Sequence, residues 1–299
     1  MNSFTDPPIW ESQNSEGCLR LLSAQRQTYS DAKILHFVRV SVVIFSGAGA
    51  AILTLSVQSF RPVVGAAAGF FLLVLSLASS AREKRKIESA AAMQEVFDTT
   101  VFRLPRSMKV KISSPSAAEV ARASLRHKGK GLENWYGIES RVARPLDVLI
   151  CQRANLGWGI VTHRSWAAVN LWFGILLILA ATIASIVTGL TLLEAALGVY
   201  APLVPTFKEV AESWIKNQQS ANTKEGLESI ADKLWSSSMR SGKAPSESQC
   251  RKLQDGILES RMSGVLIPDW FNRFARKREE EVMRLSATDY VEQSAAAGF

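Results

Sequence analysis

Arg141, Arg144 and Arg153 are the side chains of this sequence best placed to do chemistry, because they lie in its most basic stretch and far from its apolar runs. Guanidinium groups hold phosphates and carboxylates through paired hydrogen bonds. These arginines therefore predict a pocket for an anionic ligand, with phosphates as the obvious candidates. Arg153 also lies among apolar positions of an expected helix, where it needs a partner. The alternative for such a basic stretch is attraction to anionic lipid headgroups.

Glu194 and Asn170 stand inside long apolar runs, where polar side chains are rare. An ionisable group at membrane depth costs several kcal/mol and usually faces water or a polar partner. The two residues are therefore candidates for lining or gating a pore. Glu194 is only a turn from the outer end of its run, so the alternative is that it reaches the outer headgroups.

Catalytic and metal-binding motifs are missing from the sequence. It has no P-loop, no dinucleotide-binding glycine motif, no serine-hydrolase elbow and no zinc-protease motif. The cysteines are widely spaced and odd in number, so we expect free thiols and neither disulfides nor a zinc site. His36, His127 and His163 also lack metal-ligand spacing. We therefore expect a protein that is not an enzyme and that holds no metal and no cofactor.

Four apolar runs dominate the organisation of the chain. They cover about residues 40–57, 62–80, 167–187 and 190–207, and each has 18 to 21 residues. A helix needs about 20 apolar residues to cross the hydrocarbon core of a bilayer. The runs are joined in pairs by a few residues, so each pair predicts a transmembrane hairpin. We expect a mainly α-helical, polytopic membrane protein with four spans.

Basic residues indicate on which side of the membrane the polar segments lie. Residues 81–165 contain 16 Lys or Arg and 8 Asp or Glu, a net charge of +8 that equals that of the whole chain. The short connections within the hairpins hold one basic residue, Arg61. By the positive-inside rule, both termini and the middle segment are cytoplasmic. The expected parts are an N-terminal segment (1–39), a first hairpin (40–80), a basic middle segment (81–165), a second hairpin (166–207) and a helical C-terminal region (208–299).

Local signals divide the cytoplasmic parts into helices. Ser116 and Glu119 form a capping-box pattern, which predicts a helix from about Ala117 to His127. Residues 97–105 are expected to be irregular, because β-branched residues and a proline interrupt the helical pattern. A linker is expected over 237–248, and it is followed by helices over about 247–262 and 268–293.

Small residues spaced four apart mark faces on which membrane helices pack closely. Three of the apolar runs carry such pairs. Packing within one hairpin is the expected arrangement, although the partner helix could belong to another chain. The pairs are Gly47 with Ala51, Gly65 with Gly69, and Ala180 with Ala184.

A set of short stretches is distinctive in composition and order: Arg26–Tyr29 (RQTY), 97–105 (FDTTVFRLP), Asn134–Tyr136 (NWY), Cys151–Arg153 with Asn155 and Trp158, and Ile267–Phe271 (IPDWF). Together they resemble a bacterial family of four-transmembrane pore-forming effectors that are associated with cGAS/DncV-like nucleotidyltransferases. The hairpin layout matches as well, so the resemblance covers nearly the whole chain. One departure is Gly159, where the family often has an acidic residue.

The resemblance implies a place in an anti-phage system of the CBASS kind. A partner nucleotidyltransferase would sense infection and make a cyclic di- or oligonucleotide. The present protein would bind this messenger on its cytoplasmic side and, as a homo-oligomer, permeabilise the bacterial inner membrane, which stops the infected cell. The implied partners are the lipid bilayer and the messenger, and no nucleic acid polymer.

Under this hypothesis the basic middle segment recognises the messenger. A cyclic nucleotide offers phosphates to arginines and base faces to aromatic rings. For the aromatic residues, a place in a protein core or at the membrane interface is the alternative. The candidate ligand-binding residues are Trp135, Tyr136, Arg141, Arg144, Gln152 and Arg153.

A membrane-anchored interaction module, which recruits a partner enzyme without forming a pore, is the alternative function. The spans favour it to some extent, because apart from Glu194 and Asn170 they offer only small hydroxyls to line a pore. An enzyme that acts on a nucleotide at the membrane is a weaker hypothesis, since no catalytic constellation is present.

Overall fold

The computed structural model describes residues 7–56, 61–138, 142–157 and 159–299, and these residues form helices joined by short connections, without strands. The middle of the second apolar run is described as a helix, and its side chains are described only in part. The elements are α1 (Ile9–Ser12), α2 (Glu16–Ser56), α3 (Arg61–Phe102), α4 (Ala117–Arg126), α5 (Leu146–Gly157), α6 (Ile160–Val187), α7 (Leu192–Glu194), the π-helix η1 (Ala195–Tyr200), α8 (Ala201–Ser241), α9 (Glu247–Met262) and α10 (Asp269–Ala296).

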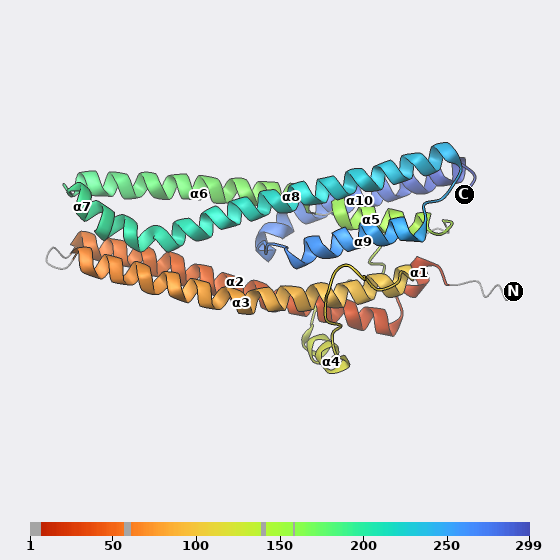
Figure 1. Ribbon diagram of the computed structural model, residues 1–299, viewed down its shortest axis with the longest axis horizontal. Helices are drawn as coiled ribbons and strands as arrows, with labels where there is room; N and C mark the ends of the chain where they lie inside the picture. Colours follow the sequence, from red (N-terminus) through yellow and green to blue (C-terminus); the bar gives the residue numbers. More distant parts are fainter. Residues whose placement is uncertain (1–6, 57–60, 139–141, 158) are drawn as a thin grey trace.

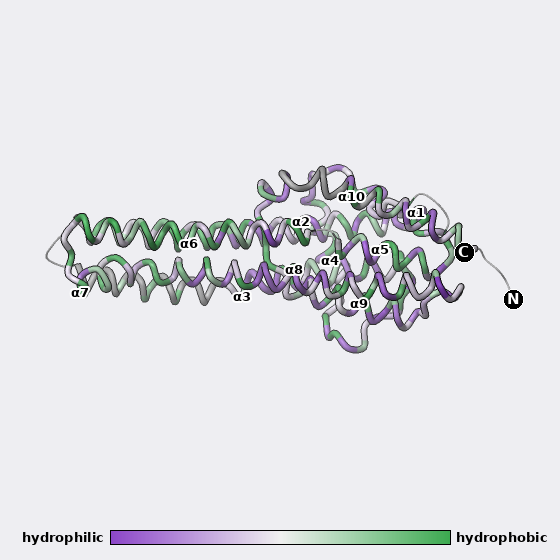
Figure 2. The backbone as a smooth tube through the Cα atoms, turned by 90° about the horizontal axis from the view of Figure 1, so that it is seen from above, coloured by the Kyte–Doolittle hydropathy of each residue, from purple (hydrophilic) through white to green (hydrophobic). Residues whose placement is uncertain are grey.

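The molecule is an elongated bundle with two different ends (Figure 1). One end contains the apolar halves of α2 and α3 and the hairpin made by α6, α7, η1 and the first part of α8. The residues of this end are mostly hydrophobic (Figure 2). The other end adds α1, α4, α5, α9 and α10, mixes polar with apolar residues, and carries both termini. We call them the apolar end and the polar end. The described residues are therefore mainly helical, as expected, whereas the four membrane spans and the domain layout stay a prediction.

Three helices run through both ends of the bundle. The lengths of α2, α3 and α8 are 41, 42 and 41 residues. At 1.5 Å per residue, each spans about 60 Å, roughly twice the hydrocarbon thickness of a bilayer. An apolar span and a polar extension are thus parts of one continuous helix, which makes these helices rigid connections between the two ends.

Two helices among the described residues are long and apolar enough to cross a membrane, α2 within Glu16–Thr54 and α6 within Leu146–Val187. The surface of α6 agrees with this, because its large apolar side chains are exposed rather than packed against the chain. Trp172, Leu176 and Ile183 each expose about three fifths of their surface. Contiguous exposed apolar surface of this kind marks contact with a partner or with lipid.

The polar end has a core of its own. Helix α5 forms the centre of this core, and most of its residues from Leu146 to Leu156 are buried. Phe97 from α3, Trp235 from α8 and Leu258 from α9 are nearly inaccessible to solvent. Buried residues of α1, α2, α3, α5, α8, α9 and α10 thus share one core, whereas α4 packs with α2 and α3 in a separate cluster.

The helix α3 is longer than the sequence predicts. Residues 97–102 are helical, so the expectation that 97–105 is irregular is wrong for its first part. The hydroxyls of Thr99 and Thr100 donate to the carbonyls of Glu95 and Val96 at 2.8 and 2.6 Å, a bond that β-branched Thr can make within a helix. The helix ends where Arg103 adopts a left-handed conformation, with φ of 55°. The linker expected over 237–248 is also shorter, because α8 continues to Ser241.

The capping box and the helix that follows it are confirmed. Ser116 Oγ accepts from the Glu119 amide, and the Glu119 side chain accepts from the Ser116 amide at 2.8 Å. The helix expected over 247–262 is also confirmed by α9. Here the local sequence alone determines where the helix begins.

Small residues of the apolar end pack between the two hairpins, which corrects the expectation of packing within one hairpin. A Cβ atom built on Gly47 would lie 2.8 Å from the carbonyl oxygen of Pro202 on α8. Ala51 of α2 is buried in a cluster with Ala181 of α6 and Leu203 of α8. The four-residue spacing therefore marks the right face of the first apolar run, but the partner is the other hairpin.

In the third apolar run the packing residue is Ala181, whereas Ala180 is exposed and Ala184 is half-buried. A packing role for Ala180 and Ala184, with a helix of this chain or of another copy, stays a prediction. The expected packing face of Gly65 and Gly69 lies outside the residues whose packing the structure describes.

Within the apolar end, η1 departs from α-helical geometry. The carbonyl of Gly198, inside η1, accepts a hydrogen bond from Thr54 Oγ1 of α2. Tyr200 and Thr182 of α6 share a hydrogen bond between their hydroxyls at 2.6 Å. The π-helix is thus hydrogen-bonded to α2 and α6 and also packs against α3, and Pro202 and Pro205 lie in the first turns of α8.

We expect Gly47→Ala to lower the stability of the bundle by about 1–3 kcal/mol, because the new methyl group clashes with a backbone carbonyl that cannot move aside. Gly49→Ala is the matched control, since nothing lies within 4 Å of its Cβ position. Thermal unfolding of the purified protein, followed by circular dichroism, measures both. Equal unfolding temperatures for the two variants would contradict the close contact of α2 with α8.

Candidate functional site

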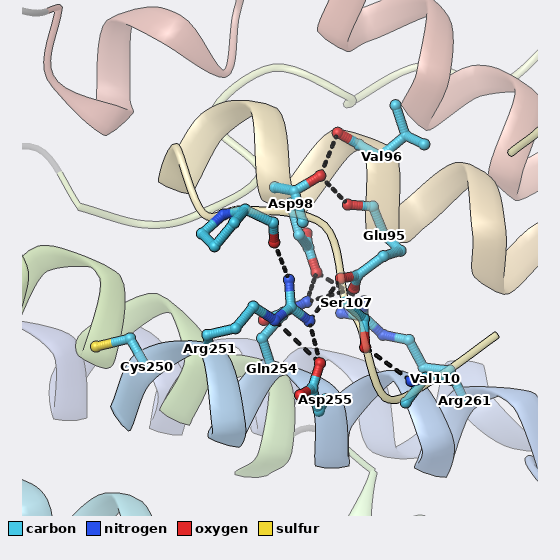
Figure 3. Close-up of polar contacts among 12 residues, drawn as sticks. Glu95, Val96, Asp98, Ser107, Val110, Cys250, Arg251, Gln254, Asp255 and Arg261 are labelled. Atoms are coloured by element: carbon cyan, nitrogen blue, oxygen red, sulfur yellow. Dashed lines mark hydrogen bonds and ion pairs between the residues drawn. The ribbon is translucent and has the colours of Figure 1, made fainter. Parts of the chain in front are cut away.

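A buried network of charged and polar side chains lies between α3 and α9 (Figure 3). Asp98 is fully buried, and its Oδ2 atom accepts hydrogen bonds from Arg261 Nη1 at 2.6 Å and from Gln254 Nε2 at 3.0 Å. Glu95, one turn earlier on α3, accepts from Arg251 Nη2 and from Gln254 Nε2, both at 2.8 Å. Two carboxylates of one helix are therefore matched by two guanidinium groups of another.

The electrostatics of this network follow from its burial. Desolvation raises the pKa of Glu95, although Gln254 and Arg251 oppose this. Burial alone would lower the pKa of Arg261, but the neighbouring Asp98 carboxylate raises it above its ordinary value. Removing one partner of a buried ion pair costs about 3–5 kcal/mol, because the other charge is left without compensation. The network therefore stabilises one relative position of α3 and α9.

The distinctive stretches of the sequence converge on this network. Tyr136 donates its hydroxyl to Asp98 Oδ1 at 2.5 Å and accepts from Asn155 Nδ2 at 2.9 Å. Gln152 donates to Gln254 Oε1 at 3.2 Å and to the carbonyl of Cys250 at 2.8 Å. The stretches around Asp98, Tyr136 and Gln152, far apart in the sequence, are thus joined in one hydrogen-bonded network.

The network residues of α9 were not predicted from the sequence. A signal was present, because Gln254 and Arg261 lie in one helical stripe with Ile257 and Leu258, with the spacing i, i+3, i+4, i+7. Polar residues in an otherwise apolar stripe indicate buried polar contacts. Their partners on α3 could not be identified without the fold.

Trp135 and Tyr136 belong to the core of the polar end, the alternative that the sequence left open. Tyr136 is 3% exposed and stacks on Phe97, with ring centroids 6.0 Å apart. Trp135 is partly buried, packs edge-on against Phe97, and lies under the guanidinium of Arg26 at 5.0 Å. A base could stack on the ring of Tyr136 only after the core opens.

The arginines expected to hold an anionic ligand have partners within the chain. Arg144 pairs with Asp147 at 3.2 Å and donates to the carbonyl of Val101 at 3.0 Å, at the end of α3. Arg153 binds Asp232 at 2.6 Å, and its guanidinium lies 4.5 Å from the ring centre of Tyr290. Arg141 lies outside the described residues.

The described arginines and aromatic residues therefore do not converge on one cavity. Gln152, the remaining candidate, is fully buried in the network. Ligand binding at these positions stays a prediction, and it would require these side chains to exchange the partners described above.

A second ionic cluster ties the three long helices together where the apolar end meets the polar end. Arg39 of α2 binds Glu209 of α8 and Glu83 of α3, the latter at 3.2 Å. His36 Nδ1 lies 2.9 Å from Glu83 Oε1. Burial would raise the pKa of Glu83, but His36 and Arg39 lower it below its ordinary value. We call Arg39, Glu83, Glu209 and His36 the junction cluster.

The polar residues of the second hairpin have local partners. Glu194 forms a capping box with Thr191, whose amide and hydroxyl donate to Glu194 Oε2 at 2.9 and 2.8 Å. Asn170 donates to the carbonyl of Trp166, one turn earlier, at 2.8 Å. Glu194 therefore lies in the first turn after the connection between the two apolar runs of this hairpin. A role for either residue in lining or gating a pore stays a prediction.

Gly159 has φ of 91°, a left-handed conformation that favours glycine. A Cβ atom at this position would lie 3.2 Å from Lys224 Nζ. The structure thus gives a conformational reason for glycine here, and it shows that an acidic side chain at this place would face a lysine of α8.

Comparison with known proteins agrees with a bundle that has an apolar and a polar end. Residues 7–290 match the family described as the SMODS-associating 4TM effector domain, and the chain belongs to this family. The chain is also 28% identical over 290 residues to a Bacillus cereus (strain VD146) protein named "Probable CBASS effector molecule", across 91% of this chain and 95% of the relative. No solved structure matches significantly.

The resemblance found in the sequence is therefore confirmed. The family and the two long apolar helices together identify a membrane protein.

We expect Arg261→Ala to lower the free energy of unfolding by about 3–5 kcal/mol, because the buried carboxyl group of Asp98 is left without its cationic partner. Lys252→Ala removes the same charge from the exposed face of α9 and is the control. Urea unfolding of the purified protein measures both. A loss below about 1 kcal/mol for Arg261→Ala would mean that the network is not a main source of stability.

His163, at the start of α6, gives the protein a pH dependence. It is hydrogen-bonded to Asn217 at 2.8 Å, and burial lowers its pKa from 6.5 to about 4, with Lys224 acting in the same direction. Below pH 6.5 the unfolded chain takes up a proton that the folded chain does not, so stability falls as the pH decreases towards 4. The loss amounts to roughly 3 kcal/mol.

The free energy of unfolding of the His163→Gln variant should therefore depend less on pH than that of the wild type. Urea unfolding at about pH 7 and about pH 5 measures the difference. If the free energy of unfolding changes equally between the two pH values in both proteins, the pKa of His163 is not lowered in the folded state.

Proposed function

We propose that this protein is the membrane effector of an anti-phage system that signals through a cyclic oligonucleotide. It binds the messenger at its polar end, on the cytoplasmic side, and permeabilises the inner membrane of the infected cell. Membership of the SMODS-associating 4TM effector family and similarity to a protein named as a CBASS effector support the role in defence. The observation that carries the mechanism is the continuity of α2, α3 and α8 from the polar to the apolar end.

In this proposal the apolar end crosses the membrane four times. The apolar halves of α2 and α3 form one hairpin, and α6 with the η1–α8 segment forms the other. Both termini lie at the polar end, as four spans require (Figure 1). The net charge of +8 in residues 81–165 supports a cytoplasmic position for this end.

The junction cluster is the proposed connection between messenger binding at the polar end and helix packing in the apolar end. A ligand shifts a conformational equilibrium only if it binds the two states with different affinity. Binding at the polar end that moves α3 relative to α2 and α8 would strain the contacts of Glu83 with Arg39. The same helices continue into the membrane, so the displacement would reach the contact of Gly47 with α8.

The pore is proposed to form between copies of the chain. Within one chain, Ala51, Val199 and Leu203 are buried against one another in the apolar end, which leaves this region packed. A homo-oligomer could instead surround a conducting path with α6 or α8 from several subunits. The same packing favours the second candidate function, a membrane anchor that recruits a partner enzyme.

Release of a dye from liposomes that contain the purified protein tests the proposal. We expect release with one member of a panel of cyclic di- and trinucleotides, and no release with the corresponding linear nucleotides. Arg39→Gln, which weakens the junction cluster, should keep messenger affinity within about twofold and change the rate of release. If a nucleotide binds tightly but never causes release, the anchor function is the better conclusion.

A further inference from the structure

A cavity of about 300 Å³ lies in the polar end, apart from the buried network and from the predicted ligand residues. One wall is a face of α3, formed by Arg85, Ser89 and Ala92, which are four and three residues apart. The connection between α3 and α4 forms the opposite wall, and Met262 at the end of α9 closes one side. The volume is at the lower end of the range for small-molecule sites, about 300–1,000 Å³.

The polar groups of this cavity suit an anion. Arg85 and Lys111 both line it, both are exposed, and neither has an ion pair among the described residues. The hydroxyls of Ser89, Ser113 and Ser114 line the same space. Charged and hydroxyl donors that converge on one volume form hydrogen bonds to phosphate oxygens without a competing partner in the chain.

Two carboxylates line the cavity as well, and both have cationic or amide partners. Glu119 belongs to the capping box of α4 and accepts from the amide and the hydroxyl of Ser116 at 2.8 and 2.9 Å. Glu88 lies 3.8 Å from Lys84. With Glu88 paired to Lys84, the remaining charges of the lining are the two cations Arg85 and Lys111 and the carboxylate of Glu119, so the balance is positive.

We propose that this cavity binds a phosphodiester, with Arg85 and Lys111 on the phosphate oxygens and the serine hydroxyls beside them. The proposal rests on the proposed function where the source is the cyclic messenger. An anionic lipid headgroup offers the same chemistry, because Arg85 lies only a few residues beyond the second apolar run.

The position of the cavity connects it to the membrane helices. Arg85 follows Glu83 of the junction cluster by two residues on α3. The opposite wall leads into α4, which packs against α2. A phosphate that draws Lys111 towards Arg85 would therefore act on the two helices of the first hairpin, close to the contact of Glu83 with Arg39.

The test compares two double variants of the full-length protein with equal loss of charge. Arg85→Ala with Lys111→Ala changes the cavity, whereas Arg82→Ala with Lys109→Ala changes neighbouring exposed residues outside it. Binding of cyclic di-AMP, cyclic di-GMP, cyclic GMP–AMP and cyclic tri-AMP is measured by isothermal titration. Thermal stability is measured in nanodiscs of phosphatidylcholine with and without phosphatidylglycerol.

We expect a nucleotide that binds the wild type to bind the cavity variant at least about tenfold more weakly, and the control variant within about twofold. If no nucleotide binds but phosphatidylglycerol stabilises the wild type and the control and not the cavity variant, the phosphodiester is that of a lipid. In that case the proposal that the protein binds a cyclic messenger is wrong, and the cavity is supported as a phosphodiester site.

Equal nucleotide affinity in all three proteins would overturn the cavity site and leave the proposed function intact. Equal stabilisation by phosphatidylglycerol in all three, without nucleotide binding, would also overturn it. If neither the cyclic nucleotides nor phosphatidylglycerol has an effect on the wild type, both the cavity site and the proposed binding of a messenger are overturned.

Discussion

Asp98 has no contact with solvent, and its two oxygens are hydrogen-bonded to three residues from two separate parts of the chain. A buried carboxylate is costly unless every lone pair is matched, so the surrounding residues are tightly constrained. Arg261 must approach from α9, and the Tyr136 hydroxyl must approach from the connection between α4 and α5. The packing of the polar end is therefore organised around one charge on α3.

This constraint reaches the apolar end because α3 continues from the polar end into it. The helix that carries Asp98 also carries Glu83 of the junction cluster, and it continues into the first hairpin. The polar end thus fixes the position of a helix in the apolar end. A different position of α3 would have to break ion pairs at both levels, so the two ends are coupled by geometry and by charge. This coupling is what an effector that responds to a soluble signal requires.

Features determined by local sequence could be predicted, and features determined by partners could not. The apolar runs, the capping box of Ser116 with Glu119 and the helix α9 follow from composition and spacing within a few residues. The helical state of Thr99 and Thr100 was missed, because α3 is stabilised there by the core that packs around Phe97. Arg153 was identified as a residue in need of a partner, but the sequence could not show that Asp232 supplies it. For Tyr136 a place in the core was one alternative, and its hydrogen bond to Asp98 could not be predicted.

The π-helix η1 changes how the fourth apolar run presents its side chains. One residue of an α-helix turns the side-chain direction by about 100°, so an extra residue in one turn rotates everything beyond it by that angle. Side chains from Ala201 onwards therefore face differently from those a straight helix starting at Leu192 would present. A helical wheel drawn through the whole run would assign lipid-facing and helix-facing positions incorrectly on one side of η1. Cysteine-accessibility scans of this segment should accordingly show two periodic patterns, out of phase with each other, that meet near Gly198.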